Sequence, residues 1–139
     1  MQAFMDFLAA NWKGIIAATI AAMIIGTIWY AKPVFGKQWQ KLAGLKDSDM
    51  KKGMLKGMVI MLIMALVTAI VLARFVVIAD PQNYMQALKL GFWLWLGFVA
   101  TYAIGGGVFE HRSPKLIALN LGNQLVTLLV MSAIIFGLR

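Results

Sequence analysis

Cysteine is absent from this chain of 139 residues, and histidine and acidic residues are scarce: there are one histidine and five acids. The absence of cysteine excludes disulfide bonds, thiolate metal sites and a cysteine nucleophile. The single histidine, His111, argues against a site built on several histidine ligands. We therefore expect no metal site and no cofactor, and we find few side chains for acid–base catalysis.

Apolar residues dominate the composition. They make up 62% of the chain and charged residues only 13%, whereas a soluble domain has roughly 45–50% and about 25%. Most of this surface therefore requires lipid as its solvent. The formal net charge of +8 comes from residues beside hydrophobic runs. This placement favours anionic lipid headgroups as partners and argues against nucleic acid.

Four hydrophobic runs are long enough to cross the roughly 30 Å hydrocarbon core of a bilayer as helices. The spans are expected at residues 14–31, 57–79, 85–104 and 114–137, within one transmembrane domain, residues 1–139. Lys32-Pro33 and Asp80-Pro81 end the first two, and Ser113-Pro114 begins the last. The predicted fold is all-α, an integral membrane four-helix antiparallel bundle.

The one sizeable polar segment is the cytoplasmic interfacial segment, residues 32–56. Apolar residues recur there at helical spacing, which predicts a short amphipathic helix lying in the membrane interface and ending at Gly44. Asp47, Ser48 and Asp49 are then expected to cap a continuous second helix over residues 49–79.

The distribution of lysine and arginine predicts the orientation. Nine lie in or beside the connections after the first and third spans, and four on the opposite side. The positive-inside rule therefore predicts a multi-pass protein of the cell inner (plasma) membrane, with basic loops in the cytoplasm and both termini outside. Arg74, within the second span, is expected to snorkel outward or to pair with Asp80.

Small residues at every fourth position predict the faces through which the spans pack. The first span has such a line at Gly14, Ala18, Ala22 and Gly26, and the third at Gly97, Thr101 and Gly105.

The fourth span carries the clearest intramembrane polar signal. Four polar residues share one helical face: Asn120, Asn123, Gln124 and Thr127. Amides in hydrocarbon are costly unless they are hydrogen-bonded. This face is therefore either a site for a polar ligand or a set of interhelical hydrogen bonds.

Glu110, His111 and Arg112 precede that span, on the predicted cytoplasmic side. Glu110 beside His111 suggests acid–base chemistry. Adjacent residues do not face one another, however, so a salt-bridged interfacial loop is the preferred interpretation.

Aromatic residues mark the first connection: Trp29-Tyr30, then Phe35-Gly36 and Trp39, in the run WYAKPVFGKQWQKLAGLKDSD. With the later run FEHRSPKLIALNLGNQLV, this motif resembles the bacterial four-helix membrane proteins grouped as domain of unknown function 1761. The resemblance covers nearly the whole chain and implies the four-helix fold, not an activity. The aromatic residues of the motif would pin the interfacial helix to the bundle.

Function is less constrained than fold. The leading hypothesis is non-enzymatic binding of a small molecule or lipid between helices, or an oligomeric transport element, with Asn120, Asn123, Gln124 and Thr127 lining the site and Glu110 and Arg112 at its mouth. The alternative is a structural or interaction subunit of a larger membrane complex. A membrane enzyme using Glu110 and His111 ranks third, and homo-oligomerisation stays open.

Overall fold

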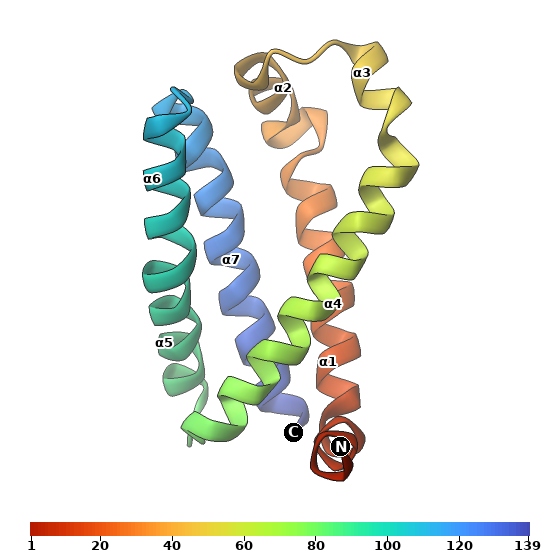
Figure 1. Ribbon diagram of the computed structural model, residues 1–139, viewed down its shortest axis with the longest axis vertical. Helices are drawn as coiled ribbons and strands as arrows, with labels where there is room; N and C mark the ends of the chain where they lie inside the picture. Colours follow the sequence, from red (N-terminus) through yellow and green to blue (C-terminus); the bar gives the residue numbers. More distant parts are fainter.

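Four long helices make up most of the structure, a computed structural model that describes residues 1–139 (Figure 1). Each is long and apolar enough to cross a membrane. They are α1 (Gln2–Trp29), α4 (Met54–Ala79), a third helix, Tyr84–Phe109, and α7 (Pro114–Leu138). The third is built from α5 (Tyr84–Leu94), the π-helical segment η2 (Trp95–Ala100) and α6 (Thr101–Phe109). Successive long helices run in opposite directions, so the predicted all-α bundle is confirmed (Figure 1).

Three short elements connect α1 to α4. They are the π-helical turn η1 (Lys32–Gly36), α2 (Lys37–Ala43) and α3 (Asp47–Lys52). The predicted short helix in this connection is therefore present. It ends at Gly44, whose φ of 72° lies in the left-handed region that a residue without Cβ adopts at little cost.

The helix bounds differ from the expected ones in three places. The first helix begins at Gln2, ahead of the expected span, so the lead-in is part of α1. The continuous second helix predicted from Asp49 is wrong: Gly53, with a ψ of 9°, interrupts it between α3 and α4. The third helix continues through its three glycines to Phe109, where Gly107 packs closely against the side chain of Ile117.

The apolar core lies between α1, α4 and α7 at the end of the bundle that holds both chain termini (Figure 1). Fully buried alanines, including Ala18, Ala69 and Ala73, allow these helices to approach closely. The remaining core residues are Phe7, Ile15, Leu72, Val76, Leu128, Met131 and Ile135.

At the opposite end the bundle opens. Residues 54–64, the first part of α4, are exposed on every side, and in Figure 1 this part leans away from α7. The connection that contains α2 and the turn between α6 and α7 both lie at this end (Figure 1). The helices therefore pack less closely at this end than around the core.

Of the two predicted lines of small residues, the line on the first helix packs against another helix and the line on the third helix does not. In the first, Gly14 and Ala18 are buried, and the position of a Cβ on Gly14 would lie 3.2 Å from Ile135 Cα. The third line faces outward, with nothing within 4 Å of the Cβ positions of Gly97 and Gly105. The third helix packs instead through Ala87, Gly91, Ala100 and Gly107.

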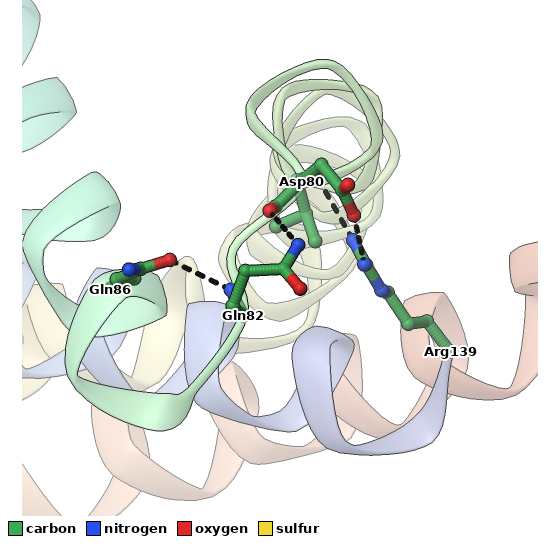
Figure 2. A network of polar contacts seen from close by, with 5 residues as sticks. Asp80, Gln82, Gln86 and Arg139 are labelled. Atoms are coloured by element: carbon green, nitrogen blue, oxygen red, sulfur yellow. Dashed lines mark hydrogen bonds and ion pairs between the residues drawn. The ribbon is translucent and has the colours of Figure 1, made fainter.

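A polar network joins the ends of α4 and α7 beside the core (Figure 2). Arg139 pairs with the Asp80 carboxylate and donates to the Val76 carbonyl oxygen at 3.2 Å. Of the two alternatives predicted for Arg74, pairing with Asp80 is therefore wrong, because Asp80 pairs with Arg139. The Arg74 guanidinium instead lies 5.6 Å from the centre of the Phe7 ring, where the aromatic face attracts the cation.

Candidate functional site

The aromatic motif attaches the first connection to α1 and α7. The Trp29 ring packs on Gly122, since two of its carbons lie 3.1 and 3.2 Å from the position of a Cβ there. The Phe35 ring packs at a tilt against the Trp29 ring, with ring centres 4.7 Å apart. The turn therefore folds back on α1 through apolar contact.

Gly36 allows this turn to close. A Cβ at this position would lie 2.3 Å from the carbonyl oxygen of Tyr30, so no side chain fits without moving the backbone. Three residues further along the chain, the Trp39 ring of α2 packs edge-on against the Tyr30 ring, with ring centres 5.4 Å apart. The Tyr30 hydroxyl donates to Asn120 Oδ1 at 2.7 Å. Tyr30 thus connects α2 with the polar face of α7.

A pocket of about 440 Å³ lies between α2 and the start of α7. Its walls come from α2, from the turn after α6 and from the first turns of α7. The lining residues are Trp39, Leu42, Ala43, Glu110, His111, Arg112, Ser113, Leu116 and Asn120. We call it the headgroup pocket, because it lies at one end of the long helices, and the ends of membrane-spanning helices reach the level of the lipid headgroups.

Both signs of charge stand at the headgroup pocket. Arg112 Nη2 lies 2.6 Å from Glu110 Oε2, and both side chains are more than half exposed. His111 adopts a φ of 55°, which turns the chain sharply between them. Glu110 is paired with Arg112, and no hydrogen bond joins it to His111. The geometry therefore presents a carboxylate and a guanidinium side by side but forms no Glu–His acid–base pair.

The polar face predicted on α7 divides between the pocket and the helix contacts. Asn120, at the pocket floor, is partly buried. Asn123 is 5% exposed, and its Oδ1 has no hydrogen-bonding partner. Gln124 and Thr127 are partly buried and do not line the pocket. Of the six predicted site residues, the pocket therefore collects Asn120, Glu110 and Arg112.

Several lining residues were not predicted as residues of a site. Leu42 and Ala43 share with Trp39 the face of α2 turned toward α7, and Leu116 lies one turn before Asn120. The apolar spacing within the short helix was the available signal. It did not reveal which part of the bundle that face would meet.

A further contact to α7 comes from the third helix. The Trp95 indole N–H donates to the Leu121 carbonyl oxygen at 3.0 Å, next to Asn120 in the chain. Together with Tyr30, it holds the first half of α7 from two sides. The pocket floor is therefore fixed by hydrogen bonds that lie within the bundle.

This combination of groups suits an amphiphilic ligand. Arg112 can bind a phosphate or carboxylate oxygen, Glu110 can bind an ammonium group, and Asn120 can accept or donate a hydrogen bond. Trp39, Leu42 and Leu116 supply an apolar wall. No group of three or more histidine, aspartate or glutamate side chains is gathered as for a metal ion.

Comparison with known proteins agrees with the aromatic motif and the helical architecture. No curated protein and no solved structure matches the chain. The sequence model of a family described as a protein of unknown function, DUF1761, matches residues 14–136, which include all four long helices in whole or large part. The chain therefore belongs to the DUF1761 family.

Proposed function

We propose that the protein is a non-enzymatic binding protein of the inner membrane that holds the polar head of a lipid or lipid-like molecule in the headgroup pocket. The supporting observation is the pocket itself, which places Glu110, Arg112 and Asn120 beside the apolar wall formed by Trp39, Leu42 and Leu116. A head bearing both a positive and a negative group fits the paired charges at the mouth.

The location of the pocket favours a ligand that enters from the bilayer. Trp29 and Tyr30, which anchor α2, are residues that prefer the level of the lipid headgroups. A polar head at this level keeps its acyl chains in hydrocarbon along the helices. A ligand of this kind can enter the pocket without exposing its apolar part to water, which would be unfavourable.

The experiment is native mass spectrometry of the protein released from nanodiscs of phosphatidylethanolamine and phosphatidylcholine. One amphiphile per chain is expected to remain bound after bulk lipid has left. Arg112→Gln removes a charge-assisted contact worth about 1.5–3 kcal/mol and should lower retention at least tenfold.

Asn120 and Gln124 provide a matched pair of variants on α7. Asn120→Leu changes the pocket floor, whereas Gln124→Leu makes the same chemical change outside the pocket. Retention should fall in the first variant and stay unchanged in the second. Because Asn120 also accepts a bond from Tyr30, Tyr30→Phe controls for loss of that contact alone. Equal retention by Asn120→Leu, Gln124→Leu and the parent protein would refute ligand binding in this pocket.

One observation favours the alternative of a structural subunit. The outward line of Gly97, Thr101 and Gly105 leaves the third helix able to approach another helix closely. On this alternative, the same spectra would show a defined oligomer that carries only bulk lipid.

A further inference from the structure

A second pocket, of about 290 Å³, lies on the other side of α2 from the headgroup pocket. Its lining comes from η1, α2 and the start of α3, and consists of Lys32, Lys37, Gln40, Lys41, Leu45 and Asp47. Trp39, Leu42 and Ala43 line the first pocket. The short helix therefore separates two sites of different chemistry, one amphiphilic and one basic.

The charges in this second pocket are unbalanced. Lys32 pairs with Asp47 at 3.5 Å, and Gln40 Nε2 donates to the same carboxylate at 2.9 Å. Lys37 and Lys41 form no ion pair. Three lysines and one aspartate leave a local charge of 3 − 1 = +2.

The spacing of Lys37 and Lys41 adds electrostatic repulsion to this excess of positive charge. Lys37 and Lys41 are four residues apart in α2, so their ammonium groups stand on one face. Like charges at this spacing destabilise a helix, and α2 has only seven residues to oppose the repulsion. An anion between the two ammonium groups would remove the repulsion and stabilise the helix.

We propose that Lys32, Lys37, Gln40 and Lys41 form a binding site for a phosphate group carrying two negative charges, separate from the headgroup pocket. Its charge matches the local +2, and the ammonium groups and the Gln40 amide supply hydrogen-bond donors. The group is either the phosphomonoester head of an anionic lipid or a soluble phosphate.

The test compares nanodiscs of phosphatidylcholine alone with nanodiscs containing phosphatidic acid, using native mass spectrometry to count retained lipid. Lys37→Gln combined with Lys41→Gln should reduce phosphatidic acid retention about 25-fold, because each lysine near an anionic group contributes a factor of about five. Lys51→Gln combined with Lys52→Gln removes the same charge from α3, outside the pocket, and should change retention less than threefold.

A separate titration with inorganic phosphate, followed by ³¹P NMR in phosphatidylcholine nanodiscs, distinguishes the two sources of the phosphate group. Binding of phosphatidic acid alone assigns a lipid headgroup, and binding of inorganic phosphate assigns a soluble compound. Lys37→Arg combined with Lys41→Arg should restore binding in either case. Equal losses in the α2 and α3 double variants, or no binding of either ligand, would overturn the proposal. Circular dichroism spectra of all variants confirm that the helices are retained.

Discussion

Gly91 and Ser132 mark a close approach of the third helix to α7. A Cβ on Gly91 would lie 2.6 Å from Ser132 Oγ and 3.0 Å from the Leu128 carbonyl oxygen. Both residues are buried, so neither neighbour can move freely.

Gly91→Ala should therefore destabilise the protein by about 1–3 kcal/mol through overpacking. Thermal unfolding in detergent, followed by circular dichroism, measures the change as a lower midpoint. Gly97→Ala is the matched control in the same long helix, since nothing lies within 4 Å of its Cβ position. A midpoint lowered equally by both substitutions would mean that the contact with Ser132 is not the cause.

The pKa of Asp47 is lowered by neighbouring side chains. A hydrogen bond from Gln40, and secondly the charge of Lys32, lower the pKa of its carboxyl below the ordinary 3.8. Because the pKa is lower in the folded state, the ionised carboxylate stabilises the connection above about pH 4. This stabilisation is lost as the pH falls through the folded-state pKa.

We expect NMR titration of Asp47 to give a midpoint below 3.8 in the parent protein. Gln40→Leu should raise the midpoint more than Lys32→Gln does, because the hydrogen bond is the larger cause. A midpoint that neither substitution changes would contradict the contacts described for Asp47.

At the scale of the elements, the polar link between the ends of α4 and α7 rests on one side chain, that of Arg139. Arg139 binds both the Asp80 carboxylate and the Val76 carbonyl oxygen, while Asp80 ends α4 with a φ of 45° (Figure 2). Gln82 donates to the Asp80 carbonyl oxygen at 2.8 Å and so extends the network into the following loop.

Arg139→Ala should therefore speed amide hydrogen exchange at residues 76–80, whereas global stability should fall by only about 0–1 kcal/mol, as for an exposed ion pair. Exchange followed by mass spectrometry tests this directly. Arg74→Ala, which removes a charge from α4 without touching Asp80, should leave exchange at residues 76–80 unchanged. Faster exchange at residues 76–80 in both variants would show that loss of the Arg139 contacts is not its cause.

The long helices could be predicted from the sequence because hydrophobic length and proline positions act locally. The short helix α2 and its end at Gly44 could also be predicted, from apolar spacing and a glycine. The partner of Asp80 depends on contacts between distant residues that no local pattern encodes. The break at Gly53 is marked only by a glycine, which helices also tolerate, so this signal did not decide the helix end. The outward position of Gly97 shows the same limit, since a line of small residues does not say which neighbour it will meet.

The candidate site was predictable only in part, for the same reason. Polar residues on one face of α7 were visible as a pattern, and Asn120 does lie at the pocket floor. The pocket also needs α2 and the turn after α6, which are far apart in the sequence. Tyr30 brings α2 to α7, because it packs against Trp39 and donates to Asn120, a residue 90 positions away. This long-range hydrogen bond has no signal in spacing.

The whole molecule has a packed end and an open end. Figure 1 shows α2 at the end of the bundle opposite the chain termini. Both pockets are lined by residues of α2, whereas the core residues come from α1, α4 and α7 near the termini. Stability is therefore concentrated away from the candidate binding sites. We propose that the open end, with its basic residues, lies on the cytoplasmic side of the membrane, as the positive-inside rule predicts.

Because the chain has no cysteine, single cysteines can be placed on either side and labelled in intact cells with a membrane-impermeant maleimide. Lys46→Cys and Lys115→Cys report on the two basic connections, and Gln82→Cys reports on the opposite end. We expect labelling of Gln82→Cys in intact cells, and labelling of Lys46→Cys and Lys115→Cys only after the membrane is permeabilised. Labelling of Lys46→Cys and Lys115→Cys in intact cells, or of only one of them, would refute the proposed orientation.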